Sequence, residues 1–325
     1  MKNNNIALLI PYFGSFPDYF PFYLHSLQYN PALHVYILSD SYYAGELPSN
    51  CTIIEYSLDK FKLAVKEKLA ISCEFNEPIK ICDYRPAYGL LFQEYISGYE
   101  YWAFGDLDVI YGDIINMLPD NWDSYDVISM LDKWVSGSLF ILRNDKRINE
   151  IFKKSSAWKN VYSSSVHYAF DECNHLYDRI KLGEDILKID ENQSFSYLLK
   201  AEMLKGGIKA WFKYSIIKER IYFDDYVLFN RGTVSQKDGN KVAYFHMINQ
   251  KRDPAFSIPL WDNIPEKYYI DRYGIATERQ HKSISYRVTS RTKGNVFRII
   301  YYLKKIFKAP NWIFHLFKQF LRQKK

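Results

Sequence analysis

The chain has 325 residues, of which 48% are hydrophobic and 25% charged, a composition typical of a globular protein with a sizeable core. It has no run of about 18 apolar residues, which excludes a membrane-spanning helix, and its four cysteines form no C-x-x-C pair, which argues against a zinc site. The net charge of +6 is uneven, because residues 277–325 carry 13 basic side chains and one acidic side chain, and the remainder is therefore net acidic.

Short apolar runs alternate with helical patterns through the first half of the chain. Residues 6–10 form an apolar run that stops at Pro11, as a buried parallel strand would, and apolar side chains recur at helical spacing over residues 19–29. Further strands are predicted at residues 34–38, 52–56, 101–104, 127–130 and 138–142, and further helices at 61–70 and 86–96. This alternation predicts an α/β fold with a mostly parallel central sheet.

The second half is less regular. A helix is predicted over residues 191–205, and strands are predicted over 218–229 and 242–246. No internal repeat or low-complexity linker interrupts the chain. We therefore expect one main domain over residues 1–276, followed by a basic tail over residues 277–325.

Two aspartates follow the predicted strand 101–104. Asp106 and Asp108 lie just past the end of this strand, at the edge where α/β folds bind ligands. Carboxylate oxygens suit Mg²⁺ or Mn²⁺, and such a cation can neutralise a diphosphate. The alternative is a pair of loop aspartates that cap a turn. The position directly after a buried strand favours the metal site.

The segment around these aspartates, KICDYRPAYGLLFQEYISGYEYWAFGDLDVIYGDI (residues 80–114), resembles bacterial glycosyltransferase-like proteins from polysaccharide gene clusters. The pieces IALLIPYFG, ILSD, SGSLFILRN, FDE and YFHMINQK agree, so the resemblance spans residues 6–252. It implies a nucleotide-sugar-binding fold of the GT-A type, with residues 1–276 as the catalytic domain. It also implies a Mn²⁺ or Mg²⁺ cofactor and a nucleotide-sugar donor, for which a UDP-sugar is the common choice.

In such enzymes the ends of the first two strands hold the nucleoside, which corresponds here to Pro11, Tyr12 and Asp40. Tyr12 can stack on a base, or it can belong to the core. Asp40 can accept hydrogen bonds from the base or ribose, or it can cap a helix. Arg85 can bind a phosphate through two hydrogen bonds, or it can form a surface salt bridge.

The resemblance places a third metal ligand near the end of the domain, where His246 closes a predicted strand. Imidazole is an acceptable ligand for manganese, and the alternative is a buried, hydrogen-bonded histidine. Lys251 or Arg252 then follows within reach of a leaving diphosphate. Together with Asp106 and Asp108, these residues form the expected donor site.

On the acceptor side, Asp171 is the first candidate for a general base and Glu172 the second, because an inverting transfer needs a carboxylate to accept the hydroxyl proton. If the transfer retains configuration, this pair only orients the acceptor. A helix-terminal acidic pair is the structural alternative. Gly137 would let a substrate approach the backbone closely. The further acidic pairs, Glu184-Asp185 and Asp190-Glu191, are expected to be solvated.

The tail contains two basic amphipathic stretches separated by Pro310. Such helices bind the headgroup region of anionic membranes, which suits a lipid-linked saccharide acceptor. The alternatives are packing on the main domain and pairing into a dimer. Nucleic acid is a poorer partner, because a broad apolar face interrupts the basic residues. With no signal peptide visible, we expect a cytoplasmic protein on the inner face of the membrane.

Two other functions are compatible with the motif. Phosphatases of the haloacid dehalogenase type also use D-x-D, with the first aspartate as nucleophile. They usually carry it on the first strand, with Thr or Val four residues after the first aspartate, where this chain has Ile110. A non-catalytic sugar-binding protein of the same fold is the second alternative.

Overall fold

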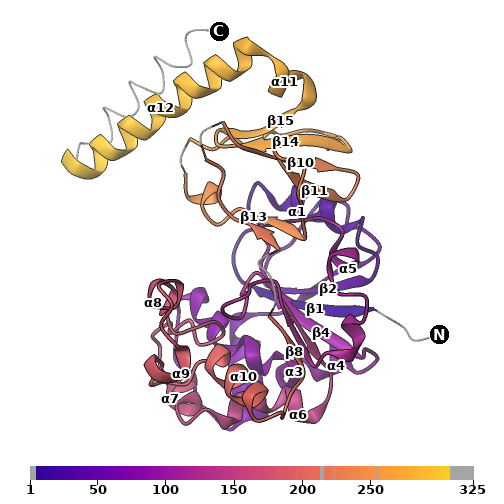
Figure 1. Ribbon diagram of the computed structural model, residues 1–325, viewed down its shortest axis with the longest axis vertical. Helices are drawn as coiled ribbons and strands as arrows, with labels where there is room; N and C mark the ends of the chain where they lie inside the picture. The colour runs from indigo at the N-terminus through magenta and orange to yellow at the C-terminus, as the bar shows by residue number, and fades with distance from the viewer. Residues whose placement is uncertain (1–4, 213–215, 223, 254, 308–325) are drawn as a thin grey trace.

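The computed structural model describes residues 5–212, 216–222, 224–253 and 255–307. Two main bodies of structure follow one another along the long axis of the molecule (Figure 1). The lower body in Figure 1 contains a central sheet with helices on both faces, and the upper body contains a second sheet. A small sheet that includes β13 lies where the two bodies meet, and it proves to be the element that builds the candidate site.

The central sheet has seven strands among the described residues, in the order β3-β2-β1-β4-β7-β6-β8. Only β7 runs antiparallel to its neighbours, so the prediction of a mostly parallel sheet in an α/β fold is confirmed. The strands are β1 (Ile6–Tyr12), β2 (Leu33–Ser39), β3 (Cys51–Glu55), β4 (Tyr101–Gly105), β6 (Val127–Ser129), β7 (Leu139–Arg143) and β8 (Ala210–Trp211).

Strand β1 shows why the first apolar run is continuous. Ile6, Leu8 and Ile10 belong to the core on one face of the sheet, and Ala7 and Leu9 belong to the core on the other. Because both faces are covered, every position of the strand favours an apolar side chain. One face is covered by α1 (Phe20–Leu27), α5 (Ile114–Met117) and the 3-10 helix η2 (Trp122–Ser124). The other is covered by α2 (Leu58–Leu69), η1 (Pro78–Ala87), α3 (Tyr88–Leu91), α4 (Gln93–Ile96), α6 (Lys146–Asn149), η3 (Ile151–Lys154), α7 (Trp158–Ser163) and α10 (Phe195–Leu204).

The predicted helix over residues 86–96 is not continuous. Pro86 lies inside the 3-10 helix η1, where it has no N–H to donate, and Phe92 leaves the helical conformation between α3 and α4. The chain therefore crosses this face of the sheet as a series of short turns. Two further short helices, α8 (Tyr177–Lys181) and α9 (Ile186–Ile189), lie beside a small apolar cluster around Cys173.

The second sheet is antiparallel, in the order β12-β11-β10-β14-β15. Its strands are β10 (Tyr226–Asn230), β11 (Thr233–Gln236), β12 (Lys241–Val242), β14 (Lys267–Asp271) and β15 (Gly274–Thr277). Phe22 of α1 packs against Phe229 and Tyr268 in the core of this sheet, which joins it to the central sheet. The prediction of one strand over residues 218–229 is wrong, because Asp224 takes a left-handed conformation (φ 62°) that breaks it.

The small sheet consists of β5 (Val109–Tyr111), β13 (Tyr244–His246) and β9 (Ile217–Lys218), in the order β5-β13-β9. β5 follows Asp108 directly, and β13 pairs with it antiparallel so that His246 lies opposite Val109. The 3-10 helix η4 (Gln250–Arg252) comes soon afterwards. This ladder brings two segments far apart in the sequence to the same edge of the central sheet.

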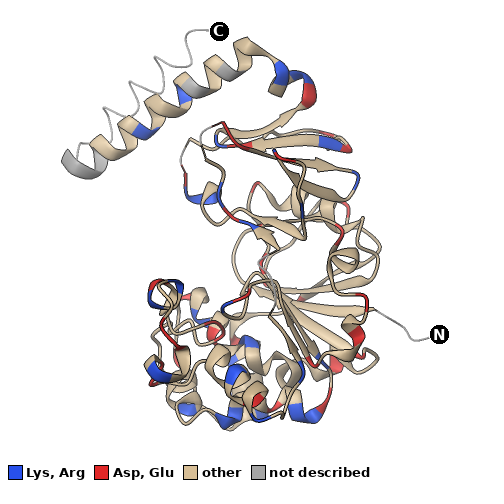
Figure 2. Ribbon diagram, in the orientation of Figure 1, with Lys and Arg blue, Asp and Glu red and all other residues tan. Residues whose placement is uncertain are grey.

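Two helices follow the second sheet. α11 (Glu278–Lys282) begins with a capping box between Thr277 and Gln280, and α12 (Ile284–Phe307) runs along the outer end of the molecule (Figure 1). Figure 2 shows acidic and basic residues mixed over the lower body, whereas the sequence of α12 contains basic residues and no acidic ones. No helix in the described part of the chain has the length and apolar character to cross a membrane. The second amphipathic stretch, after Pro310, lies outside the described residues.

Candidate functional site

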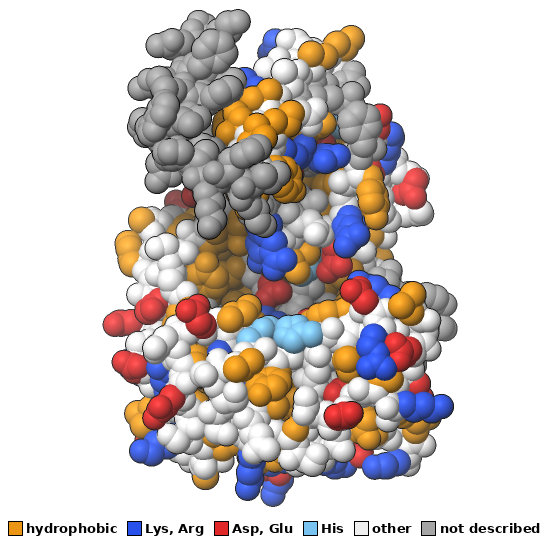
Figure 3. All heavy atoms as spheres, turned by 90° about the vertical axis from the view of Figure 1, so that its left-hand side faces the viewer, with side chains coloured by type: hydrophobic (Ala, Val, Ile, Leu, Met, Phe, Trp, Pro, Cys, Tyr) orange, Lys and Arg blue, Asp and Glu red, His pale blue; other side chains and the backbone are white. Residues whose placement is uncertain are grey.

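A pocket of about 210 Å³ opens at the carboxyl ends of β1 and β4. Among its lining residues are Pro11, Tyr12, Arg85, Asp106, Asp108 and Lys251, all of which the sequence singles out. Figure 3 shows the surrounding face hollowed between the two bodies, with charged side chains inside the hollow and histidine side chains at its lower edge. A larger cavity of about 440 Å³ lies against β14 and α11 but shares none of these residues. The chemistry of the candidate site therefore belongs to the smaller pocket.

The centre of the site is a cluster of two carboxylates and one imidazole. One ligand atom from each of Asp106, Asp108 and His246 lies within 4.8 Å of the others. Nε2 of His246 is 3.4 Å from Oδ2 of Asp108 and 3.7 Å from Oδ2 of Asp106. The β5–β13 ladder fixes this arrangement, because the N–H of Met247 donates to the carbonyl of Asp108 at 2.8 Å. The structure thus brings together the three residues predicted as metal ligands.

Glu219, which follows β9, determines which nitrogen of the His246 ring faces the two aspartates. Its Oε1 lies 3.0 Å from Nδ1 of His246, so a proton on Nδ1 is held there and Nε2 faces the two aspartates. Nε2 of His246 and Oδ2 of Asp108 are both buried, and Nε2 has no hydrogen-bond partner among the described residues, whereas the ammonium of Lys251 pairs with Oδ2. A lone pair that faces two carboxylates is stable only if a proton or a cation lies between them.

Positive charges already gather at this point. The ammonium of Lys251, from η4, lies 2.7 Å from Oδ2 of Asp108. Burial alone would raise the pKa of Asp108, yet His246 and Lys251 hold it well below its usual range. Burial opposes protonation of His246, but Asp108 and Glu219 raise its pKa above the ordinary value. The cluster therefore favours the anionic form of Asp108 and attracts cations.

The donor set of this cluster fits a divalent cation. Two carboxylates supply hard oxygen ligands and the imidazole supplies a nitrogen ligand, a combination suited to Mn²⁺ and acceptable for Mg²⁺. Oδ2 of Asp108, which Lys251 pairs with from one side, and Nε2 of His246 are buried and lie 3.4 Å apart, so they face the same space. Asp106 is partly exposed toward the pocket, so a cation held here would remain open to a ligand.

Arg85 joins the two sides of the site. Its Nη2 donates to Oδ1 of Asp106, and its Nη1 donates to Oδ2 of Asp171 at 2.8 Å. The side chain of Arg85 is only 10% exposed, so the surface salt bridge considered from sequence is not observed. Because η1 positions this guanidinium on the wall of the pocket, one positive charge contacts the carboxylate cluster and the predicted acceptor side at once.

Tyr12 and Asp40, predicted to hold a nucleoside, lie in different surroundings. Tyr12 lines the pocket, stacks on Phe16 with ring centroids 5.7 Å apart, and donates its hydroxyl to the carbonyl of Ser15. Asp40 is exposed and does not line the pocket. Its Oδ1 accepts from the N–H of Gly14 at 2.9 Å, which fixes the loop after β1. It caps no helix, so that alternative is not observed either.

Asp171 and Glu172 stand behind Arg85 and do not line the pocket. Asp171 is buried against the Arg85 guanidinium, and Glu172 accepts from the N–H of Gly137 at 3.0 Å and from the Tyr177 hydroxyl. Burial raises the pKa of both carboxyl groups. A substrate has no room at Gly137, contrary to expectation, because an added Cβ would lie 2.7 Å from Arg85 Nη1 and 2.9 Å from Glu172 Oε1.

One acidic pair expected to be solvated is partly buried. Asp190 is 5% exposed and accepts from the N–H of Ser194 at 2.8 Å and from Asn174 at 2.7 Å. It therefore holds the loop that precedes α10. Glu184 is exposed, as expected, and pairs with Arg179.

No pattern in the sequence indicates Glu219 as a site residue. Lys218 pairs with Phe245 in the β9–β13 ladder, so the next residue, Glu219, comes beside His246 only when these strands associate. A neighbour 27 positions away has no local pattern, and the predicted strand over residues 218–229 would have placed Glu219 in its interior. The position of Glu219 beside His246 therefore follows from strand pairing, and local spacing does not predict it.

Fold and site together define a mixed α/β protein with a carboxylate–imidazole cluster and two cationic side chains at the carboxyl edge of its central sheet. The chain belongs to the family described as a family of unknown function, DUF6625, which matches residues 8–279. No curated protein matches the sequence.

Several solved structures are partly similar to the chain, and they are glycosyltransferases. The galactosyltransferase LgtC, in complex with donor and acceptor sugar analogues, is 14% identical (TM-score 0.30; 50% of this chain and 67% of LgtC covered). GlyE from Streptococcus pneumoniae TIGR4 is 13% identical (TM-score 0.31; 64% and 44% covered). The PaToxG glycosyltransferase is 13% identical (TM-score 0.30; 62% and 70% covered). The matched part spans less than half of GlyE, and scores this low leave the function to be judged from the site.

Proposed function

We propose that this protein is a metal-dependent glycosyltransferase of the GT-A type that transfers a sugar from a nucleotide-diphosphate sugar to a saccharide or lipid-linked saccharide. The observation that supports it is that Asp106, Asp108, Arg85 and Lys251 line one pocket, where His246 faces the two aspartates. Two cationic side chains beside a cation-binding cluster can stabilise the negative charge of a diphosphate leaving group. Synthesis of a bacterial surface polysaccharide is the process we assign to it, from the sequence resemblance.

On the donor side, Asp106, Asp108 and His246 would hold Mn²⁺ or Mg²⁺, which supplies charge neutralisation for the diphosphate when bound. Arg85 and Lys251 line the same pocket and add positive charge where the leaving group accumulates negative charge. The ring of Tyr12 is available to stack on the base, and a UDP-sugar is our proposed donor. Asp40 supports this wall indirectly, through Gly14.

On the acceptor side, Asp171 and Glu172 remain the candidate acidic residues. Arg85 holds the first and Tyr177 holds the second, and neither reaches the pocket wall. This supports the alternative in which the pair positions groups for the acceptor, over direct removal of the hydroxyl proton. A general base role for Asp171 would require the ion pair with Arg85 to open.

The region after residue 276 is our proposed membrane contact, at the inner face of the cytoplasmic membrane. Ile284, Val288, Ile299 and Leu303 of α12 are exposed apolar residues on a helix without acidic ones. Arg298 ties the helix to the main domain through Asp253 at 2.8 Å, so part of the helix also packs on the protein. Vesicles containing phosphatidylserine should retain the full chain and should lose it when Ile299 and Leu303 are both changed to Asp. Equal retention of both proteins would refute the contact.

The haloacid dehalogenase alternative is not favoured. It requires Asp106 to attack phosphorus, but Oδ1 of Asp106 is bound by Arg85 and Oδ2 faces His246. The motif also follows β4, the fourth strand along the chain, whereas those enzymes usually carry it on the first. Hydrolysis of an aryl phosphate that is lost in Asp106→Asn would support this alternative instead.

A thermal-shift screen of nucleotide sugars with and without Mn²⁺ tests the proposal. We expect one donor to raise the melting temperature in a Mn²⁺-dependent way, because a ligand that binds only the folded state stabilises it. Asp108→Ala should abolish this rise, while the matched variant Asp262→Ala, at an exposed aspartate, should keep it. If no nucleotide sugar shifts the wild type, the proposal fails. A shift without release of the nucleoside diphosphate would indicate the non-catalytic sugar-binding alternative.

A further inference from the structure

We propose that Trp134 and the loop of residues 164–177 form a platform that binds a sugar ring of the acceptor saccharide. We call the rings of Trp134, Tyr177, His175 and His167 the ring platform. The proposal rests on the proposed glycosyltransferase function and adds the location and the ligand class of the acceptor subsite.

The four rings of the ring platform make a continuous series. Trp134 and Tyr177 meet edge to face with centroids 5.6 Å apart, Tyr177 and His175 at 6.2 Å, and His175 and His167 at 5.3 Å. His175 is exposed and the other three residues are partly exposed, while Trp134 and Tyr177 also pack against the apolar cluster around Cys173. Rings with polar edges present an apolar face and hydrogen-bonding atoms together, the combination that a sugar ring requires.

The ring platform lies directly behind the donor pocket. From Asp106 the contacts pass to Arg85 and on to Asp171, and a ring nitrogen of His167 lies within 4.8 Å of the Asp171 carboxylate. A second route leads from Arg85 past Gly137 to Glu172, which accepts from the Tyr177 hydroxyl. A saccharide on the platform would therefore lie one side chain away from the wall that holds the donor.

A buried amide oxygen accompanies the rings. Oδ1 of Asn174 is buried and has no hydrogen-bond partner within the described ranges, whereas Nε2 of His167 lies 3.9 Å from the buried Asp83 carboxylate. A buried polar atom without a partner costs stability, so such atoms are uncommon unless a ligand or water serves them. A sugar hydroxyl can donate to the amide oxygen of Asn174, the residue that precedes His175 of the ring platform.

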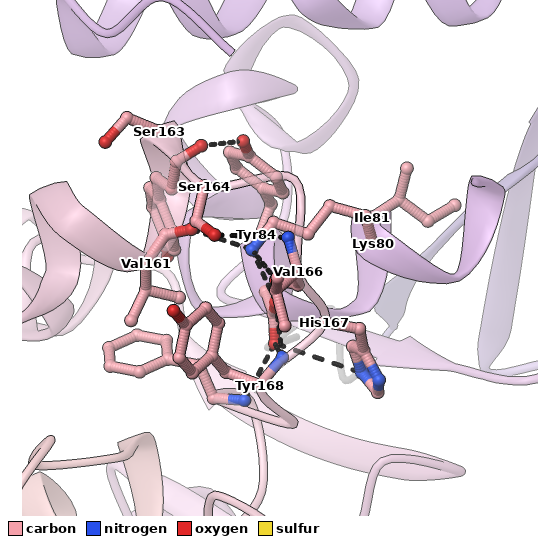
Figure 4. A network of polar contacts seen from close by, with 12 residues as sticks. Lys80, Ile81, Tyr84, Val161, Ser163, Ser164, Val166, His167 and Tyr168 are labelled. Atoms are coloured by element: carbon pink, nitrogen blue, oxygen red, sulfur yellow. Dashed lines mark hydrogen bonds and ion pairs between the residues drawn. The ribbon is translucent and has the colours of Figure 1, made fainter. Parts of the chain in front are cut away.

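The loop is bound by a fully buried ion pair between Lys80 and Asp83, and Figure 4 shows Lys80 beside Val161 and Val166. The ammonium of Lys80 lies 2.8 Å from Asp83 and also donates to the carbonyls of Val161 at 2.7 Å and Val166 at 2.6 Å. Both side chains of the ion pair have no exposed surface.

Asp83 in turn accepts from the N–H groups of Tyr168 and Phe170, so η1 binds three backbone positions of the loop and one of α7. The same η1 segment carries Arg85. One short helix thereby fixes the donor wall and the platform relative to each other, as a site that must align two substrates requires.

An oligosaccharide array probed with the full chain, UDP and Mn²⁺ tests the platform. The array should present galactosides, glucosides, mannosides and N-acetylhexosaminides. We expect the wild type to bind one of these classes, and His175→Ala and Trp134→Ala each to weaken that binding about tenfold, the scale of one ring contact. His175→Phe, which keeps a ring, should restore much of it.

Two measurements separate the possible failures. The donor-induced thermal shift should be unchanged in His175→Ala, and Tyr222→Ala, at an exposed ring elsewhere, should bind the array as the wild type does. If the wild type binds donor but no saccharide, or if the platform variants bind equally well, the platform is refuted while the proposed function stands. If the wild type shows no donor shift at all, the proposed function itself fails.

Discussion

Replacing Glu219 should weaken cation binding although Glu219 is not itself a predicted ligand. Its Oε1 lies 3.0 Å from Nδ1 of His246, and it keeps the other ring nitrogen directed at Asp106 and Asp108. Partners of this kind contribute about 10- to 100-fold to metal affinity. Because the Glu219 side chain is 41% exposed, solvent screens its charge, and we place Glu219→Ala near the lower end, about tenfold or about 1.4 kcal/mol.

Titration of Mn²⁺ followed by electron paramagnetic resonance measures the free ion directly and requires no substrate. Glu219→Gln keeps an oxygen for Nδ1 but loses the charge, so its loss of affinity should be smaller than that of Glu219→Ala. Glu266→Gln, at an exposed carboxylate paired with Arg231, is the matched control and should leave affinity unchanged. Wild-type affinity in Glu219→Ala, or a larger loss in Glu219→Gln, would show that His246 is positioned by something else.

Four further predictions concern other parts of the molecule. Lys80→Met leaves the Asp83 carboxylate buried without its charge partner, so urea unfolding should show a loss of about 3–5 kcal/mol; a loss below about 1 kcal/mol would contradict the buried pair. Arg85→Lys cannot bind Asp106 and Asp171 together, so turnover should fall at least about tenfold, and the melting temperature should fall as well because the buried Asp171 loses its partner; unchanged turnover would contradict its role. Lys251→Met removes the ammonium beside Asp108, so Mn²⁺ alone should bind more tightly while the donor-induced thermal shift becomes smaller; a change in only one of the two would separate the roles. Burial lowers the pKa of His25 to about 4, so between pH 6.5 and 4 the unfolded chain binds more protons than the folded protein. The free energy of unfolding, measured by urea titration, should therefore fall as the pH is lowered through this window, and it should fall less steeply in His25→Phe.

The parts of the site that the sequence predicted are those that depend on local patterns. The apolar run of β1 and the aspartates after β4 can be predicted from the sequence, because a buried strand and the turn beyond it are each a few residues long. Their meeting at one edge follows from parallel pairing of β1 with β4, which is a general property of such sheets. For the same reason the sequence predicts ligand binding at the carboxyl ends of these strands, where the pocket of about 210 Å³ lies.

The parts that were not predicted depend on pairings distant in the sequence. Arg85 was identified as a possible phosphate ligand, but its contact with Asp171, 86 positions away, follows only from the way η1 packs on the loop after α7. The Lys80–Asp83 pair looks like an exposed i, i+3 pair in the sequence. In the structure it is fully buried, because the backbone of residues 161–170 closes over it. Burial by a remote segment is a property of the assembled fold, and no local spacing encodes it.

The charges of the site explain why its two halves are linked. Asp106 and Asp171 share the single guanidinium of Arg85, so any ligand that draws Arg85 toward the pocket weakens its hold on Asp171. A diphosphate is such a ligand, because it offers oxygens in the geometry that a guanidinium binds. Asp171 would then lose part of its ion pair while a ring nitrogen of His167, in the ring platform, lies within 4.8 Å of its carboxylate. Donor binding at one wall would in this way alter the electrostatic environment at the other, through a single side chain.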